Sequence, residues 1–367
     1  MRGRTIRHTA AIVAAILLLS ALAGCQRTSS RCSKYSDSLF DVFNTLITVV
    51  AYAQSEEEFD SYFATIRARF EQLHRLYDIY NDYQGVNNVK TINDNAGVQP
   101  VKVDKEIIDL LLCATNWHKR TGGKTNVAMG ALLRIWHDYR EEGQDDPENA
   151  KLPPMEDLLE AEKHTDIDKV VIDAENNTVY LADPEMRLDV GAVAKGYATE
   201  IVAREMAAAG LKSALISSGG NIRAIGKPLD GVRERWGVGI QNPDESIMPD
   251  EQNVLDVIFI NDSSVASSGD YMRYYVVNGR VLHHIIDPAT LMPADYYKAV
   301  TVMTDHAGVA DFLSTALFLL PHEQSRALAE SLDGVEAIWV MPDGKVEATD
   351  GMKAIMRSHG ASGASAR

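Results

Sequence analysis

The apolar and polar positions of the chain follow the periods of short strands, interrupted by a few amphipathic helices. Residues 40–53 are rich in Val, Thr and aromatic side chains and predict a strand. Ser55 and Glu58 form a capping-box pattern, so a helix is expected to begin there. Its apolar stripe holds Phe59, Tyr62, Phe63, Ile66, Phe70, Leu73 and Tyr77. The body of the chain is therefore expected to open with a strand followed by a long helix.

Further helices are predicted by the same periodicity and by capping and stop signals. They are expected over residues 104–118, from about 130 to 139, from 155 onward, over 191–209 and from about 311 to 321. Residues 79–100 are polar and Asn-rich, which suggests a binding loop. The acidic residues 141–154 are expected to form an exposed insertion.

Turn residues between β-type runs predict several hairpins. Asn278-Gly279 separates the runs 274–277 and 281–286, and Asn176-Asn177 and Asp343-Gly344 mark two more. Other strands are expected at 187–190, 214–216, 221–225, 236–241, 254–260 and 299–303. Strands outnumber helices and are mainly joined by hairpins. We therefore predict an α+β fold with mixed, mainly antiparallel sheets and packed helices, in a single domain over residues 39–357.

The two ends of the chain carry signals of a different kind. Three arginines, an apolar stretch too short for a comfortable membrane span and Leu22-Ala23-Gly24-Cys25 predict a lipoprotein signal peptide over residues 1–24, with lipidation of Cys25. The Ser-rich residues 25–38 are expected to form a tether, and residues 358–367 a disordered tail. The protein is thus expected to be held by lipid on the extracytoplasmic (periplasmic) side of a membrane.

Charge and cysteine content argue against several classes of function. The net charge is −16, and removal of residues 1–24, which hold three arginines and no acid, would make it more negative. Such a surface argues against nucleic acid or anionic lipid as the partner. A bound phosphate would need help from a metal ion or from backbone N–H groups. Cys32 and Cys113 make no disulfide framework, and no Cys/His spacing suggests zinc.

One pair of side chains offers oxygen ligands for a metal. Asp311 and Thr315 lie four residues apart in a helical pattern, so they share one helix face. A carboxylate and a hydroxyl are ligands of the kind that Mg²⁺ takes. The alternative is a solvated Asp311 and a Thr315 at the edge of the core.

The hairpin at residues 278–279 collects further candidates. It would bring Tyr271 and Arg273, which share a strand face, near the level of His283 and His284. Because neighbouring residues of a strand point to opposite faces, one of the two histidines can face a site and the other is structural. The following Asp287-Pro288 is interpreted as a turn.

Two Gly-containing segments have a form that suits a phosphate. Residues 188–198 predict a strand, a tight turn at Gly191 and a helix start, whose N-terminus favours an anion. A purely structural turn is equally consistent with this segment taken alone. Residues 217–221 (Ser-Ser-Gly-Gly-Asn) form a second small-residue loop at a strand end.

Together these segments resemble the ApbE family, the FAD:protein FMN transferases. The matching segments keep their order over most of the chain. They are Phe43-Asn-Thr45, Leu188-Asp-Val-Gly-Ala-Val-Ala-Lys-Gly-Tyr-Ala198, Ser217-Ser-Gly-Gly220, Ser267-Ser-Gly-Asp-Tyr-Met-Arg273, His284-Ile-Ile-Asp-Pro-Ala-Thr290 and Ala310-Asp-Phe-Leu-Ser-Thr-Ala-Leu317.

The resemblance implies a reaction and a set of roles. FAD is split at its pyrophosphate, FMN passes to a threonine or sometimes a serine of a target protein with an exposed Ser/Thr-Gly-Ala-Thr/Ser type segment, and AMP leaves. Mg²⁺ would be held by the main-chain carbonyl of Ala192, by Asp311 and by Thr315, and His284 would be the catalytic base. The residues implied to face FAD are Phe43, Tyr80, Lys124, Thr125, Asn126, Asp189, Lys195 and the backbone of Ile285.

The chain departs from the family pattern at three places. Phe43-Asn44-Thr45 stands where Met-Gly-Thr is usual, Thr125-Asn126 where Phe-Asp is usual, and Leu291 where a glycine is expected. These departures concern the flavin pocket rather than the metal site.

Three other functions are open from the sequence. The same fold could hydrolyse FAD to FMN and AMP with a metal ion, or bind FAD without catalysis. A solute-binding lipoprotein would be expected to show two βαβ-rich lobes, which the hairpin pattern does not predict. Ser362-Gly363-Ala364-Ser365 also resembles the family's acceptor segment, so the tail could itself accept FMN on Ser365, but a plain disordered terminus is the interpretation that we favour, because short matches arise easily.

Overall fold

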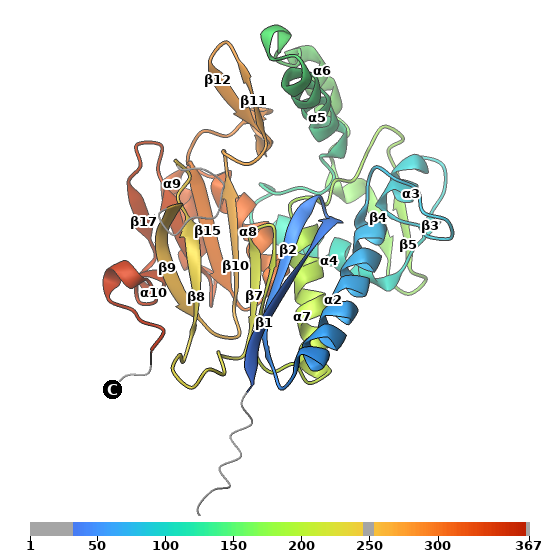
Figure 1. Cartoon of the computed structure of the whole chain (residues 1–367). Helices are drawn as coiled ribbons and strands as arrows, with labels where there is room; N and C mark the ends of the chain where they lie inside the picture. Colours follow the sequence, from blue (N-terminus) through green and yellow to red (C-terminus); the bar gives the residue numbers. More distant parts are fainter. Residues whose placement is uncertain (1–31, 245–252, 365–367) are drawn as a thin grey trace, which may run out of the picture.

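An eight-stranded sheet forms the centre of the computed structural model (Figure 1), which describes residues 32–244 and 253–364. Its order is β1-β2-β6-β7-β10-β15-β16-β17, and every pairing is antiparallel. The strands are β1 Ser33–Val42, β2 Thr45–Ala53, β6 Ala214–Ser218, β7 Asn221–Ile225, β10 Ser264–Gly269, β15 Ala299–Thr304, β16 Glu336–Val340 and β17 Val346–Ala348. Cys25, the predicted signal peptide and Ser365 lie outside the described residues.

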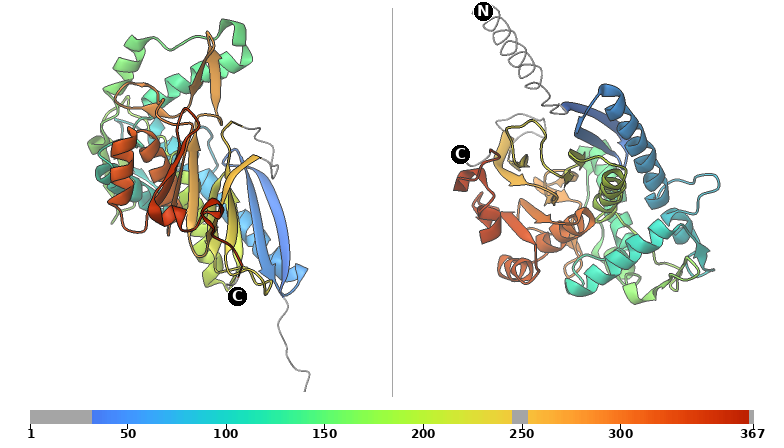
Figure 2. Two further views of the ribbon diagram at one scale, coloured as in Figure 1. Left: turned by 90° about the vertical axis from the view of Figure 1, so that its left-hand side faces the viewer. Right: turned by 90° about the horizontal axis from the view of Figure 1, so that it is seen from below.

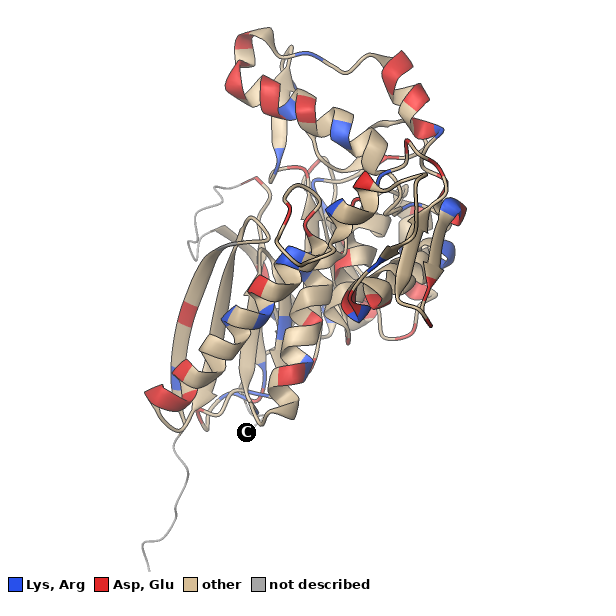
Figure 3. Cartoon of the chain, turned by 90° about the vertical axis from the view of Figure 1, so that its right-hand side faces the viewer, with Lys and Arg blue, Asp and Glu red and all other residues tan. Residues whose placement is uncertain are grey.

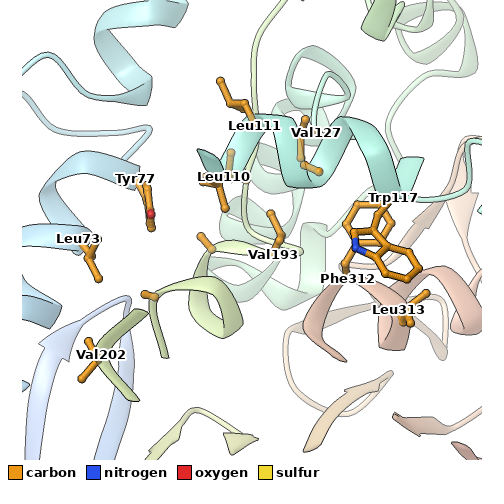
Figure 4. Packing of buried hydrophobic residues seen from close by; sticks show 14 of the residues in the cluster. Leu73, Tyr77, Leu110, Leu111, Trp117, Val127, Val193, Val202, Phe312 and Leu313 are labelled. Carbon is orange, nitrogen blue, oxygen red and sulfur yellow. The ribbon is translucent and has the colours of Figure 1, made fainter. Parts of the chain in front are cut away.

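Helices cover one face of this sheet. They are α2 Glu56–Tyr77, α4 Lys105–Arg120, α7 Ala194–Ala208, α8 Ala307–Phe318 and α9 His322–Glu330. The capping box at Ser55 begins α2 as predicted, with the Ser55 side chain accepting from the N–H of Glu58. Side chains from α2, α4, α7 and α8 interdigitate in the largest core cluster (Figure 4), whose burial is the main force that holds α7 against α8.

The opposite face of the sheet carries a hairpin, β8 Trp236–Gln241 with β9 Val254–Ile260, and the short helix α10 Asp350–Lys353 (Figure 2). Trp236 and Ile258 from the hairpin pack in one cluster with Ile338 of β16. The sheet is therefore buried on both faces.

A projecting arm stands at one end of the sheet (Figure 1). It consists of α5 Gly130–Asp145, α6 Met155–Glu162 and the hairpins β11 Tyr274–Val277 with β12 Arg280–His283 and β13 Ile286–Asp287 with β14 Met292–Pro293, with the short 3-10 turn η1 Pro147–Asn149. The arm has its own cluster of buried apolar residues around Trp136 and Leu282. Helix α5 runs six residues beyond its predicted end, so part of the predicted insertion 141–154 is helical. Gly143 lets this part of the helix lie close to the ring of Tyr275, since a Cβ there would come within 2.5 Å of that ring.

The remaining elements surround the base of the arm. A small sheet has the order β3-β5-β4, from β3 Val101–Lys102, β4 Val170–Asp173 and β5 Thr178–Leu181. The predicted loop 79–100 contains the helix α3 Val89–Asp94, and two further 3-10 turns are η2 Ile167–Lys169 and η4 Arg357–His359. The α+β fold with mainly antiparallel sheets is thus confirmed.

Three predictions about chain segments are wrong. Residues 40–53 form not one strand but a hairpin, because Phe43 and Asn44 both adopt positive φ angles and turn the chain. Strand β1 begins at Ser33, inside the predicted tether, because residues 33–39 pair in register with β2. Residues 187–190 make a single parallel bridge, between Arg187 and Met129, instead of a strand.

The predicted disordered tail is also wrong as far as residue 364. The Gly363 carbonyl accepts hydrogen bonds from the N–H groups of Glu234 and Arg235, and Ala364 bridges to Arg233. These contacts fix the segment against the β8–β9 hairpin, because each backbone bond there gains a protein partner. Over residues 32–244 and 253–364, the structure contains no helix with the length and apolar character needed to span a membrane.

Candidate active site

Helices α7 and α8 meet at a contact that only glycine permits. A Cβ on Gly196 would lie 2.3 Å from the Ala307 carbonyl oxygen and 2.5 Å from the Cβ of Asp311. The N–H of Gly196, in the first turn of α7, donates to Asp311 Oδ2 over 2.8 Å. Because the first-turn N–H groups of a helix lack partners within it, Asp311 caps α7 from the neighbouring helix.

Asp311 is a buried carboxylate next to a cation. The residue is 6 % exposed, and Lys195 Nζ lies 4.0 Å from its Oδ2. Burial raises the pKa of Asp311, and Lys195, the Gly196 N–H and Asn221 oppose that rise. Lys195 also donates to the Gly191 carbonyl over 3.3 Å, so its ammonium is held at the turn before α7. The carboxylate, the ammonium and the helix N-terminus therefore converge on one point.

A group of hydroxyls extends this point along α8. Ser268 Oγ, near the end of β10, lies 2.8 Å from Ser314 Oγ and 3.2 Å from Thr315 Oγ1. Ser314 in turn donates to the Asp311 carbonyl over 2.9 Å. Thr315 is thus tied to β10 one helical turn beyond Asp311, and the sequence-predicted pair shares one helix face.

The turn between β6 and β7 completes this side of the site. Ser218 Oγ and Asn221 Oδ1 are buried, and no hydrogen-bond partner for either is found in the part of the chain that the structure describes. A buried polar atom without a partner is costly, so such atoms indicate a missing ligand or water. Gly219 allows the turn, since a Cβ there would lie 2.3 Å from Thr45 Oγ1 and its φ is +55°.

The chemistry of these donors fits Mg²⁺. Asp311 supplies a carboxylate and Thr315 a hydroxyl, and Ala192 lies in the turn just before α7. Hard oxygen ligands with few carboxylates are typical of magnesium sites that use substrate phosphates and water as further ligands. No group of three or more His, Cys, Asp or Glu side chains suited to a metal occurs within residues 32–244 and 253–364.

The two neighbouring histidines have different surroundings. His283 is 6 % exposed; its Nε2 lies 2.6 Å from the Ala294 carbonyl, and its Nδ1 accepts from the Ile285 N–H over 3.2 Å. His284 Nδ1 is buried, with no hydrogen-bond partner among the described residues. Burial and the nearby charge of Arg273 hold the pKa of His284 well below its usual range. His283 is therefore structural, as predicted for one of the pair, and His284 is a neutral imidazole with an unused nitrogen.

Arginines, rather than backbone groups alone, supply positive charge near His284. Arg273 and Arg140 both lower the pKa of His284, and both oppose the rise that burial causes in the pKa of Tyr80, to about 12. Burial and the charge of Arg273 lower the pKa of Arg140 in turn. The charge of Asp189 raises the pKa of the Tyr80 hydroxyl. Asp189 Oδ1 also accepts a hydrogen bond from the Gly191 N–H over 2.8 Å.

These arginines change the sequence interpretation. Arg273 was expected to share a strand face with Tyr271, but both lie in the turn between β10 and β11. Arg140 lies on α5, whose acidic character gave no signal for a site. Tyr80 is 56 % exposed, and its ring lies 5.5 Å from the ring of His137, which is on α5 like Arg140.

The loop before α5 is tied to the His284 segment by a buried ion pair. Lys124 Nζ lies 3.2 Å from Asp287 Oδ1, and Asp287 is 2 % exposed. The predicted turn at Asp287-Pro288 is present, since Asp287 Oδ1 accepts a hydrogen bond from the Ala289 N–H. The same carboxylate also forms the ion pair with Lys124. The ion pair fixes the loop at residues 122–126 against the chain that carries His284.

The other two predicted residues of this loop are held differently. Thr125 Oγ1 is buried, and among the described residues it has no hydrogen-bond partner. The Asn126 side chain donates to the Thr165 carbonyl over 2.8 Å and accepts from the Ala128 N–H over 2.8 Å. Asn126 therefore shapes the loop, and Thr125 offers the free polar atom.

Two of the three family departures lie at left-handed backbone positions. Asn44 (φ 50°) and Leu291 (φ 60°) stand where the family has glycine, and their backbones keep the conformation that favours glycine. Leu291 is buried in the arm, and its carbonyl accepts from Trp136 Nε1 over 2.9 Å. Phe43 packs edge-on at 5.5 Å from His74, whose Nδ1 accepts the Phe43 N–H.

The backbone of Ile285 is already engaged on both sides. Its N–H donates to His283, and its carbonyl accepts from the Ala294 N–H over 3.1 Å. A further contact of Ile285 would have to use the second lone pair of that carbonyl oxygen.

Comparison with known proteins places this site in a family. The profile described as "ApbE family" matches residues 43–339. A protein of Treponema pallidum (strain Nichols), named FAD:protein FMN transferase, is 35% identical over 273 residues, which cover 71% of this chain and 72% of the relative. A protein of the same name from Klebsiella pneumoniae (strain 342) is 30% identical over 276 residues, covering 74% and 80%.

A solved structure agrees with the fold. The crystal structure of the ApbE protein from Thermotoga maritima superposes with a TM-score of 0.76 at 28% sequence identity, covering 88% of this chain and 99% of the other. The profile match includes Lys195, His284, Asp311 and Thr315, so the point where α7 and α8 meet lies within the shared region.

Proposed function

The chain belongs to the ApbE family of FAD:protein FMN transferases, and we propose that it uses Mg²⁺ to transfer FMN from FAD to a threonine or serine hydroxyl, with AMP as the leaving group. The observation that carries the proposal is the buried Asp311 carboxylate at the N-terminus of α7, with Lys195 4.0 Å away and Thr315 one turn along α8. This arrangement of charges suits a bound pyrophosphate.

The proposed step balances as a phosphoryl transfer. The acceptor oxygen forms a bond to the phosphorus of the FMN half, and the bond from that phosphorus to the bridging oxygen breaks. The electron pair of the broken bond leaves with AMP, and the proton of the acceptor hydroxyl passes to a base. Such reactions depend on positioning and charge neutralisation more than on covalent help from the protein.

Three oxygen donors would hold the metal ion: Asp311, Thr315 and the main-chain carbonyl of Ala192. When bound, Mg²⁺ would polarise the phosphate oxygens and stabilise the negative charge that builds up on AMP. Ser268 orients Thr315 through the 3.2 Å contact between their hydroxyls. On a chain of net charge −16, a local cation also helps an anionic cofactor to bind.

The start of α7 would bind the phosphates. Its N-terminus carries partial positive charge, and Lys195 adds a full charge at the same place. Arg273 and Arg140 extend the positive region toward His284. Phosphate oxygens would thus exchange hydration for contacts that are fixed before FAD arrives.

His284 would be the base. Its low pKa keeps the imidazole neutral near pH 7, and its buried Nδ1 has no partner among the described residues. A neutral histidine with a free nitrogen can accept the proton of the acceptor hydroxyl as the oxygen attacks. The nearby cations then stabilise the acceptor oxygen rather than the imidazolium.

The remaining predicted residues would contact the rest of FAD: Phe43, Tyr80, Lys124, Thr125, Asn126, Asp189 and the Ile285 backbone. Tyr80 is half-exposed and electrostatically linked to Asp189, and the Thr125 hydroxyl is unused. Lys124 also holds its loop in place through the ion pair with Asp287.

We propose further that the chain works outside the cytoplasm, anchored by a lipid on Cys25, and that its partner is a protein with an exposed Ser/Thr-Gly-Ala-Thr/Ser type segment. The lipobox pattern Leu22-Ala23-Gly24-Cys25 supports the anchor. Cys25→Ser is expected to abolish metabolic labelling with a fatty acid. Normal labelling of that variant would contradict the proposal.

Metal-dependent hydrolysis of FAD is the alternative, with water in place of the acceptor hydroxyl. The test is to incubate the purified protein with FAD and Mg²⁺, with and without a Thr-Gly-Ala-Thr peptide, and to measure AMP. Transfer predicts AMP release that depends on the peptide, in equal amount with an FMN–peptide adduct. AMP release at the same rate without peptide would identify a hydrolase.

A further inference from the structure

The β11–β12 hairpin of the arm has two unlike faces. Tyr275 and Leu282, which pair across the strands, are 3 % and 1 % exposed and pack into the arm's core with α5. The Tyr275 hydroxyl donates to the Lys151 carbonyl over 3.0 Å, which fixes this inner face to the segment that joins α5 and α6. The inner face is thus fully used in holding the arm together.

The outer face of the same hairpin is apolar and open. Val276 pairs with Val281 and Tyr274 pairs with His283, so these four residues share that face. Tyr274, Val276 and Val281 are 42 %, 42 % and 49 % exposed, and Met272, just before β11, is 48 % exposed. An apolar cluster of this kind on one face of a two-stranded sheet is typical of an interaction surface.

This outer face continues into a cavity of about 270 Å³. The cavity is lined by Arg280, Val281 and His283 of the hairpin, by Ala294, Tyr297 and Lys298, and by the carboxyl side chains of Asp270 and Asp295. The cavity could take one or two side chains of a bound segment, while Val276 and Tyr274 would lie under the segment's continuation. His283 is the immediate neighbour of His284, so their Cα atoms are about 3.8 Å apart.

The charge of the hairpin is opposite to that of the chain. Within residues 273–283 the charged side chains are Arg273, whose charge acts on His284, and Arg280, which is exposed and forms no ion pair with any described residue. The helices behind the hairpin are acidic, as Figure 3 shows along α5 and α6. On a chain of net charge −16, an unpaired arginine beside an apolar face favours an acidic partner.

We propose that the outer face of the β11–β12 hairpin docks an extended segment of the acceptor protein that carries both acidic and apolar side chains. The proposal rests on the proposed function, since transfer to a protein requires that the protein be held near His284. Apolar side chains would cover Val276 and Val281 and enter the cavity, and an acid would pair with Arg280. The start of β1, where the described chain begins, lies at the other end of the sheet (Figure 1), away from this face.

The test uses two labelled peptides and measures binding without FAD. Both contain the same Thr-Gly-Ala-Thr segment; one has flanks of Glu and Asp alternating with Leu and Val, and the other has flanks of Gly and Ser. Fluorescence anisotropy is measured for the wild type and for the Val276→Ser/Val281→Ser variant. Leu159→Ser, at a 49 % exposed position on α6, is the matched control.

The proposal predicts that the wild type and the control bind the acidic–apolar peptide at least about ten-fold more tightly than the Gly–Ser peptide, since covering two valines contributes more than 1.4 kcal/mol. The double variant should lose that preference, and Arg280→Gln should weaken it in a salt-dependent way. All four proteins should release AMP from FAD with the Gly–Ser peptide at the same rate.

Two results would overturn the proposal: equal binding of the two peptides by the wild type, or an unchanged preference in the double variant. A third contradicting result could come from sedimentation velocity. If the wild type forms a dimer and the double variant does not, this face is an interface between two copies of the chain. Failure of AMP release in every protein, with the binding preference intact, would instead contradict the proposed function.

Discussion

The backbone N–H of Gly196 donates to the carboxylate of Asp311, and this 2.8 Å contact joins the helix proposed to bind phosphate to the helix proposed to supply metal ligands. The contact explains how a buried carboxylate is kept in place, since the N-terminal charge of α7 and Lys195 offset part of the cost of burial. The position of the proposed metal site is therefore set by helix packing.

Replacement of Gly196 by alanine should separate the two helices. The new Cβ would meet the Ala307 carbonyl at 2.3 Å, which neither backbone can relieve without a shift. We expect a loss of about 1–3 kcal/mol in the free energy of unfolding. We also expect weaker Mg²⁺ binding, so that half-maximal AMP release requires a higher Mg²⁺ concentration. Urea unfolding and a Mg²⁺ titration measure the two effects. A variant that reaches half-maximal AMP release at the wild-type Mg²⁺ concentration would show that the α7–α8 contact does not position the proposed metal site.

The two histidines should respond differently to alanine. His284→Ala is expected to keep FAD affinity and to lose transfer by about 10²–10⁴-fold, because the base acts on the acceptor proton and not on the cofactor. His283→Ala should instead lower stability, since it removes the partners of Ile285 and Ala294. Equilibrium FAD binding, single-turnover transfer and urea unfolding separate these outcomes. Equal losses of FAD binding and rate in His284→Ala would make this residue part of the pocket wall.

The pH dependence of transfer should lack the acid limb of an ordinary histidine. Burial first, and then Arg273, lower the pKa of His284 well below 6.5, so the ring stays neutral as the pH falls through 6.5. The rate constant kcat/KM should therefore stay level there and fall only at lower pH. Arg273→Gln removes a cation that disfavours protonation, and its acid limb should move to higher pH.

The same shift has a consequence for stability. As the pH falls through 6.5, the unfolded chain takes up a proton on its exposed histidine while the folded chain does not on His284. The contribution of His284 to the free energy of unfolding is thus present above this pH and is lost below it. An acid limb of kcat/KM centred at 6.5 in the wild type would contradict the assignment of a low pKa.

The Lys124–Asp287 pair should behave as a buried ion pair. Lys124→Met leaves a 2 % exposed carboxylate without its cation and should cost about 3 kcal/mol in the free energy of unfolding. Lys124→Met/Asp287→Asn should recover much of that loss, because no buried charge remains. Lys105→Met breaks the exposed pair with Asp109 and should cost less than about 1 kcal/mol. Similar costs for both lysine variants would show that the buried pair does not secure the loop.

The sequence predicted the helices that carry Lys195, Asp311 and Thr315, because the apolar periodicity and the order of the segments identify these elements. Asp311 and Thr315 needed only helical periodicity to share a face, and the resemblance gave Lys195 as a residue that faces FAD. The contact of Gly196 with Asp311 joins residues 115 positions apart, so no local pattern could show it. Arg140 was missed for the same reason, since it lies on a helix whose own pattern indicates a solvated face.

The errors in the fold have equally local causes. Phe43 and Asn44 form a turn without the glycine or proline that usually marks one, so the hairpin of β1 and β2 was predicted as a single strand. The small residues of the C-terminal segment suggested disorder, but a side chain at Gly363 would lie 3.0 Å from the ring of Phe259, so small size there permits close packing.

The central claim, Mg²⁺-dependent transfer supported by Asp311, is tested most directly by one mass measurement. The wild type, Asp311→Asn and the control Asp305→Asn, at an exposed position just before α8, are incubated with FAD, Mg²⁺ and a Thr-Gly-Ala-Thr peptide. The account predicts that the wild type and the control add one FMN to the peptide for each AMP released, and that Asp311→Asn adds none while remaining folded. An FMN–peptide adduct formed by Asp311→Asn at the wild-type rate would contradict it.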